Sequence, residues 1–162
     1  FSMPGWRMGF AVGNDILIGA LEKIKSYLDY GAFTPIQVAA ASALSSDPST
    51  IAKVREVYKK RRNVLVDAMS KAGWEIPSPD ATMFAWAPIP EKFKSLGSLE
   101  FSKVLLKEAD ISVAPGIGFG EYGENFVRIG LVENEHRIRQ AARNIKAVFT
   151  KADKILSDHS PN

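Results

Sequence analysis

Two arginines stand in surroundings that favour binding of an anion. Arg7 follows residues 4–6 (PGW), and the glycine there lets the backbone come close to a ligand. Arg128 lies in the apolar stretch 126–132, where strand alternation turns it away from the apolar side chains. A guanidinium among apolar neighbours is costly unless it meets an anion, and its planar fork fits a phosphate or carboxylate edge. At each position a structural ion pair remains the alternative.

Two further motifs have simpler interpretations. Residues 118–123 (GFGEYG) match the G-x-G-x-x-G pattern, but a dinucleotide fingerprint needs that loop to open a helix. Here it leads into the predicted strand 126–132, so we interpret it as a turn or as a loop beside a ligand. The basic run 59–62 (KKRR) falls on a predicted helix and we interpret it as a solvated face, since no aromatic platform for nucleic acid accompanies it.

Composition excludes several classes of function. The 162 residues contain no cysteine and only two histidines, so we expect no disulfide scaffold, no thiolate chemistry and no metal site. No apolar run reaches the ~18 residues of a membrane span. The net charge of +3 permits an anionic ligand without indicating nucleic acid. No signal peptide is visible, and we expect a cytoplasmic protein that does not bind a membrane.

Helices alternate with short strands along the chain. Apolar spacing and capping residues predict helices over 15–28, 36–44, 49–72, 99–109 (capped by Ser98) and a last helix that begins after Asn134. Short apolar runs predict strands over 8–12, 74–76, 81–87, 111–114 and 126–132. The helix over 49–72 is long enough to link two domains, and the mixture after it predicts an α+β layer.

Two segments of the chain carry a family resemblance. Residues 1–10 (FSMPGWRMGF) resemble the segment just after the Schiff-base lysine of fold-type-I pyridoxal-phosphate aminotransferases, class I/II. Residues 115–120 (PGIGFG) and 126–129 (FVRI) are similar to the small-domain signature of that family. The order and separation of the two segments also fit. The alanine (glutamate–pyruvate) aminotransferase branch is the closest in resemblance, on residues 25–31 (KSYLDYG), 60–62 (KRR) and 97–101 (GSLEF).

The resemblance implies a fold and a domain organisation. The fold class is α/β, with residues 1–46 as the end of the large cofactor domain. Residues 47–73 would form the linking helix, and 74–162 the smaller α+β domain. The Schiff-base lysine would lie upstream of Phe1, so no residue of this chain is assigned that role.

The resemblance also implies roles for particular side chains. Arg7 matches the arginine that binds the phosphate of pyridoxal 5'-phosphate, and Arg128 matches the arginine that binds the substrate carboxylate. By looser analogy, Thr34 would contact the site of the partner subunit, while Phe84 and Phe119 would line the substrate pocket. The activity implied is transfer of an amino group from an amino acid, with alanine and glutamate as the implied substrates, to a 2-oxo acid by a homodimer.

Two alternatives remain open on the same fold. One is the aminotransferase-like effector domain of a transcription regulator, which binds DNA through a separate module. The other is a pyridoxal-phosphate-dependent carbon–sulfur lyase, which would release pyruvate and ammonia.

Overall fold

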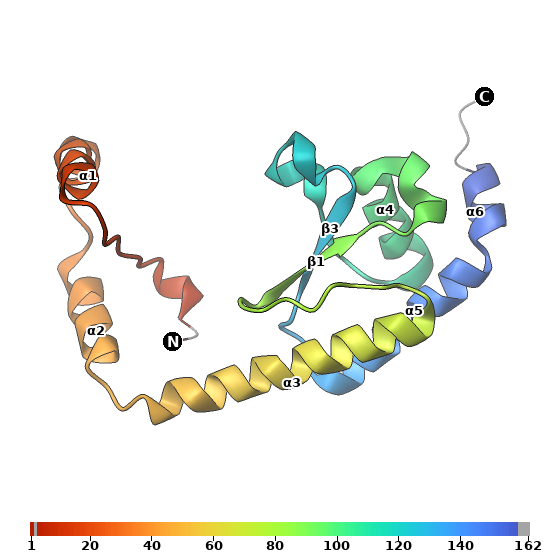
Figure 1. Cartoon of the computed structure of the whole chain (residues 1–162), viewed down its shortest axis with the longest axis horizontal. Coiled ribbons are helices and arrows are strands. Elements are labelled where there is room, and N and C mark those ends of the chain that lie inside the picture. Colours follow the sequence, from red (N-terminus) through yellow and green to blue (C-terminus); the bar gives the residue numbers. More distant parts are fainter. Residues whose placement is uncertain (2, 159–162) are drawn as a thin grey trace. The chain divides into compact units, whose positions relative to one another are not determined.

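The computed structural model describes residues 1 and 3–158, and the chain divides into two units (Figure 1). The first unit is Phe1–Arg55 and the second begins at Glu56, so the division falls inside one long helix. The domain boundaries expected after residues 46 and 73 stay predictions.

The first unit is helical. It contains the 3-10 turn η1 (Pro4–Trp6), α1 (Asp15–Leu28), α2 (Thr34–Leu44) and the first turns of α3 (Ser49–Ala72). The Asn14 side chain accepts hydrogen bonds from the backbone N–H groups of Ile16 and Leu17, which confirms it as the cap of α1. The strand expected over 8–12 is wrong. These residues form neither helix nor strand and take no part in the pairing of the described sheet.

Helix α3 has the bounds that the apolar spacing predicts. Leu65, Met69 and Ala72 on its last turns are buried in the second unit. Gly73, at φ +88°, adopts the left-handed conformation that ends a helix, and the Trp74 N–H donates to the Met69 carbonyl there.

The second unit is built on a three-stranded antiparallel sheet with the order β1-β3-β2. The strands are β1 (Phe84–Pro88), β2 (Ala114–Pro115) and β3 (Phe126–Gly130). The helices are α4 (Gly97–Ala109), α5 (Glu135–Thr150) and α6 (Ala152–Asp158), with 3-10 turns η2 (Glu91–Leu96), η3 (Gly116–Phe119) and η4 (Glu121–Gly123). This mixture of helix and strand agrees with the predicted fold class.

The two faces of this sheet differ in character. Ala85, Ala87 and Val127 are fully buried in one core with side chains of α3, α4 and α5. The side chains between them in the strands, Trp86 and Arg128, point the other way and stay partly exposed. The helices therefore cover one face, and the opposite face is left for the site.

Several local predictions are wrong because tertiary contacts override local pattern. Residues 74–76 form no strand. The side chains of Trp74 and Ile76 are instead buried in the core from an irregular segment. Ser98 lies inside the first turn of α4 rather than capping it, because a carboxylate from another segment, Glu124, accepts the Ser98 N–H. The basic run is only half solvated, since Arg61 Nη1 donates to the carbonyls of Leu131 and Val132, at 3.0 and 3.1 Å.

None of the helices in the described part of the chain is both long and apolar enough to cross a membrane.

The Trp74 indole gives a test of the core. Its Nε1 donates to the Pro88 carbonyl at 2.7 Å, and its ring meets those of Phe101 and Phe149. Trp74→Phe removes the donor and leaves that carbonyl unpaired, so we expect the free energy of unfolding to fall by about 1–3 kcal/mol. Urea denaturation followed by circular dichroism measures this loss. Tyr122→Phe, at a side chain that is 99% exposed, is the control and should leave the free energy of unfolding unchanged. Equal stability of the two variants would contradict a stabilising role for the Trp74–Pro88 hydrogen bond.

Candidate functional site

Strand β3 positions Arg128 at the centre of the sheet. Its neighbour Val127 is fully buried, and alternation turns Arg128 to the opposite face. In the register of the sheet, Arg128 pairs with Trp86 of β1 and with Ala114 of β2. A strand bonded on both sides fixes the backbone from which the guanidinium projects.

Two aromatic rings pack on the Arg128 guanidinium. Its central carbon lies 4.3 Å from the ring centroid of Phe84 and 4.4 Å from that of Phe119. No ring-to-ring contact joins Phe84 and Phe119 in the described structure, so each ring contacts the guanidinium separately. Cation–π attraction of this kind is worth about 0.5–2 kcal/mol per ring. The structure thus brings together three of the predicted site residues.

The edge of the Arg128 guanidinium is left without an anionic partner. Within residues 1 and 3–158, Arg128 takes part in no ion pair and no side-chain hydrogen bond. A guanidinium carries five N–H donors in its plane, and those of Arg128 bind no acceptor side chain in the described chain. The structural ion pair considered from the sequence is therefore not formed within the described chain, and the donors suit a carboxylate that approaches edge-on.

Two further aromatic side chains, Trp86 and Phe126, extend this surface. The Trp86 ring meets Phe119 edge-on at 5.7 Å and stacks on Phe126 at 5.5 Å. Neither was singled out from the sequence. The signal was present, because Trp86 follows Phe84 by two residues on one strand and so shares its face. We call Phe84, Trp86, Phe119, Phe126 and Arg128 the aromatic–arginine cluster.

Arg7 belongs to the first unit and is exposed. It follows the 3-10 turn η1 with φ +54°, in the left-handed region, and its Nη1 donates to the Pro4 carbonyl at 3.3 Å. The remaining guanidinium donors have no partner in the described chain, so they are free to bind the oxygens of a phosphate. Arg7 lies at the rim of a shallow hollow that is lined by Met3, Pro4, Gly5, Trp6, Arg7 and Ile36.

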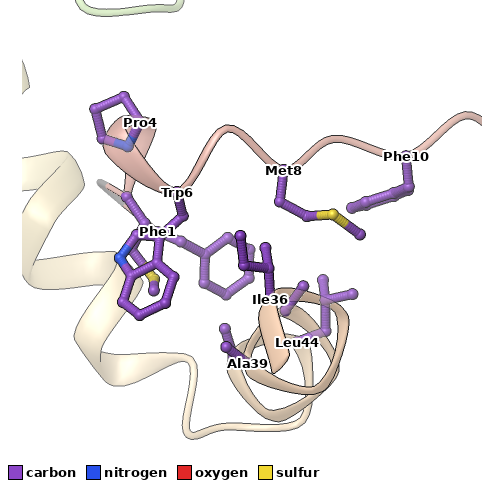
Figure 2. A pocket seen from close by; sticks show the side chains of 11 residues that line it. Phe1, Pro4, Trp6, Met8, Phe10, Ile36, Ala39 and Leu44 are labelled. Carbon is purple, nitrogen blue, oxygen red and sulfur yellow. The ribbon is translucent and has the colours of Figure 1, made fainter. Parts of the chain in front are cut away.

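Apolar side chains from residues 1–10 and from helix α2 line one hollow. Figure 2 shows Phe1, Trp6 and Met8 gathered around Ile36 and Ala39. They enclose a hollow of about 280 Å³ with no charged side chain in its lining. Arg7 is not among the residues that line this apolar hollow.

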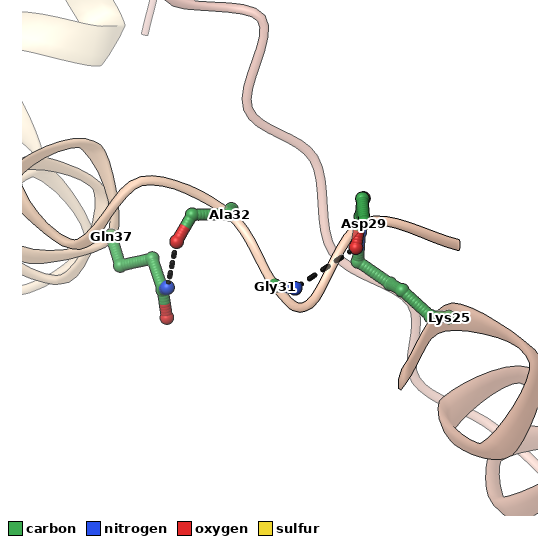
Figure 3. Close-up of polar contacts among 5 residues, drawn as sticks. All are labelled: Lys25, Asp29, Gly31, Ala32 and Gln37. Atoms are coloured by element: carbon green, nitrogen blue, oxygen red, sulfur yellow. Dashed lines mark hydrogen bonds and ion pairs between the residues drawn. The ribbon is translucent and has the colours of Figure 1, made fainter. Parts of the chain in front are cut away.

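Thr34 begins α2, directly after a tightly held loop. The Asp29 carboxylate binds the Lys25 ammonium and accepts the Gly31 N–H at 3.0 Å, as Figure 3 shows. The hydrogen bond from Lys25, with that from Gly31, lowers the pKa of the Asp29 carboxyl. The loop turns Tyr30 outward, 94% exposed and at φ +55°. Thr34 is also exposed, and its relation to Arg128 stays a prediction because the two residues belong to different units.

The described residues contain no group of three or more His, Cys, Asp or Glu side chains that could hold a metal ion. The charged donors at the two candidate positions are the guanidinium groups of Arg7 and Arg128. Such donors suit anions, namely phosphate at Arg7 and carboxylate at Arg128.

Comparison with known proteins identifies the family. Residues 1–145 match the family model described as aminotransferase class I and II. The chain belongs to the class I and II aminotransferase family. This confirms the family predicted from residues 1–10, 115–120 and 126–129.

Named aminotransferases are similar over almost the whole chain. "Putative aminotransferase AatC" of Rhizobium meliloti is 69% identical over 156 residues, and "Glutamate-pyruvate aminotransferase AlaC" of Escherichia coli is 54% identical over 156 residues. Each alignment covers 96% of this chain and 38% of the relative. The chain therefore spans less than two fifths of the length of each of these two relatives.

Solved structures confirm the fold class. The apo structure of BacF from Bacillus subtilis superposes with a TM-score of 0.80 at 36% identity, over 91% of this chain and 37% of that one. The aromatic aminotransferase of Pyrococcus horikoshii gives 0.80 at 30% identity, over 94% and 41%. The roles assigned to Arg7, Thr34, Phe84, Phe119 and Arg128 in this class I and II chain stay predictions.

The loop at Asp29 should respond to acid. Because the pKa of Asp29 is lower in the folded loop than in the unfolded chain, its hydrogen bonds stabilise the loop above about pH 4 and are lost as the pH falls through the folded pKa. We expect the NMR shift of the Gly31 amide to titrate with a midpoint below ~3.9, the ordinary aspartate value. In Asp29→Asn this titration should vanish. A Gly31 titration that survives the substitution would refute the assignment.

Proposed function

We propose that this chain is the carboxylate- and phosphate-binding part of a pyridoxal-phosphate-dependent aminotransferase. The observation that supports this most is the Arg128 guanidinium, packed against two aromatic rings and without an anion partner in the described chain. The names of the relatives favour transfer of an amino group from an amino acid to a 2-oxo acid. The similarity to the glutamate–pyruvate aminotransferase of Escherichia coli favours alanine and glutamate as donors.

Arg128 would bind and orient the substrate carboxylate. Two parallel N–H donors on one edge of the guanidinium match the two oxygens of a carboxylate and fix its plane. Because Phe84 and Phe119 pack on the group, rotation of the guanidinium out of this plane is opposed by both rings. The aromatic rings cover part of the cation, and lower exposure to water strengthens its attraction for the anion.

Arg7 would hold the cofactor through its phosphate. Pyridoxal phosphate, when bound, supplies the electron sink that allows an amino group to be moved. The donors of Arg7 that have no partner in the described chain suit a phosphate group. The residue that would bond covalently to the cofactor is not among those described.

The loop around Thr34 would complete the site of a second subunit. Its exposed Tyr30 and Thr34 and its internal hydrogen bonds make it a shaped projection available to a partner. This supports the homodimer implied by the family resemblance, in which Thr34 reaches the neighbouring site.

Arg128→Gln in the full-length enzyme tests the carboxylate assignment. A hydrogen bond to a charged group contributes about 1.5–3 kcal/mol, so losing this anchor should lower kcat/KM for L-alanine about 100-fold. L-Alaninamide has no carboxylate, and its slower reaction should change by less than about threefold. Steady-state and single-turnover kinetics give both numbers.

The same assays separate the alternatives. If Arg128→Gln lowers kcat/KM equally for alanine and its amide, or lowers it for neither, the role of Arg128 is contradicted. Release of pyruvate with ammonia in the absence of a 2-oxo acid would indicate the lyase. Binding of DNA by the full-length protein, without turnover of amino acids, would indicate the transcription regulator.

Arg7→Gln should act on the cofactor. Loss of a bidentate phosphate contact should raise the Kd for pyridoxal phosphate by about tenfold or more, since each hydrogen bond to a charged group is worth about 1.5–3 kcal/mol. Visible absorbance after dialysis against graded cofactor concentrations measures it. Arg55→Gln, on an exposed position of α3, is the matched control and should retain its cofactor. Full retention by Arg7→Gln would count against the phosphate assignment.

A further inference from the structure

Phe119 reaches the Arg128 guanidinium from the loop of residues 116–123, in which Gly116 and Gly123 are buried but the Phe119 ring is not. The ring is 52% exposed, and its ring contact besides Arg128 is with Trp86. A side chain as exposed as this is not held by a core around it. The position of the Phe119 ring on the guanidinium therefore depends on the backbone of its loop, residues 116–123, together with the ring contact to Trp86.

Ser98 and Glu124 join the two ends of this loop. At its start, the Ile117 N–H donates to Ser98 Oγ at 3.0 Å. At its end, Glu124 Oε2 accepts the Ser98 hydroxyl at 2.8 Å and Oε1 accepts the Ser98 N–H at 3.2 Å. Ser98 has no exposed surface and belongs to the first turn of α4, so it is a fixed point for both bonds. We call the chain of contacts Glu124–Ser98–Ile117 the loop brace.

Glycines bring the backbone close enough for the loop brace to form. A Cβ on Gly116 would lie 1.9 Å from the Gly123 carbonyl oxygen, and one on Gly123 would lie 2.1 Å from that of Gly116. A Cβ on Gly97 would lie 2.2 Å from Glu124 Oε1, and Gly97 also has φ +69°. Side chains at these positions would push the two ends of the loop apart or displace the carboxylate.

The negative charge of Glu124 is favourable at the start of helix α4. The carboxylate accepts a backbone N–H in the first turn of α4, a helix of 13 residues whose N-terminus carries partial positive charge. Charge-assisted hydrogen bonds are stronger than neutral ones. Both oxygens of Glu124 are used on Ser98, so an amide in their place would lose one acceptor.

We propose that Glu124 and Ser98 are positioning residues for substrate binding: the loop brace holds Phe119 on the Arg128 guanidinium and so sets the affinity for the substrate carboxylate. This inference rests on the proposed function of Arg128. Without the loop brace, the Phe119 ring moves off the Arg128 guanidinium. The guanidinium is then free to rotate and to bind water. The carboxylate must compete with that water and order the group as it binds.

The test uses the full-length, cofactor-loaded enzyme and the variants Glu124→Gln and Ser98→Ala. We expect the KM for L-alanine and for pyruvate to rise about 3- to 10-fold, the size of one cation–π contact, with kcat within twofold. The reaction of L-alaninamide, which has no carboxylate to place on Arg128, should not change. Glu121→Gln removes an exposed carboxylate of the same loop and is the matched control with unchanged kinetics.

A double-mutant cycle shows whether the effect passes through Phe119. In a Phe119→Leu background the ring is already gone, so Glu124→Gln should add no further rise in KM. An equal rise in both backgrounds would overturn the proposal, as would an unchanged KM in Glu124→Gln or a loss of kcat that follows a fall in Tm. If Ser98→Ala does not fold, the Glu124→Gln cycle alone decides.

The outcome for Arg128 separates this inference from the function on which it rests. If Arg128→Gln abolishes the preference for the carboxylate and Glu124→Gln does not weaken it, only the loop brace is refuted. If Arg128→Gln keeps the preference for alanine over its amide, the proposed function fails and the brace fails with it.

Discussion

A cation held among aromatic rings is the interaction on which the candidate site of the second unit depends. Arg128 sits on the central strand of a small sheet, with Phe84 from a neighbouring strand and Phe119 from a loop against its guanidinium. A buried or half-buried charge without an anion is costly, and ring contacts offset only part of that cost. The arrangement is therefore suited to receive an anion rather than to stabilise the fold.

The two units of the chain are stabilised in different ways. The second unit has a continuous core in which Trp74, Phe93 and Phe101 are fully buried. In the first unit none of the described residues is buried, and Phe10, Ile16 and Leu17 are at least 70% exposed. Its helices rely on local devices such as the Asn14 cap and the Lys25–Asp29 pair. Apolar surface of this extent is typical of a segment that packs against other protein.

Local signals predicted the helices well and the strands poorly. The bounds of α3 follow from apolar spacing and from the glycine after it, both of which act within one turn of helix. Residues 8–12 and 74–76 have the apolar character of strands, yet neither forms one. A strand forms only when it hydrogen-bonds to a neighbouring strand, and the sequence of one segment does not show where that neighbour will lie. Arg61 shows the same limit, because its bonds to the carbonyls of Leu131 and Val132 depend on how α3 packs.

By itself the sequence determined the family, the long helix and the side of the strand from which Arg128 projects, because motifs, helical spacing and strand alternation are all short-range patterns. The tertiary structure decided which rings meet the guanidinium, that Trp86 joins them, and that Glu124 reaches Ser98. Those contacts join residues that are far apart along the chain. They are set by sheet register and by close approach of glycine backbones, which depend on the whole fold at once.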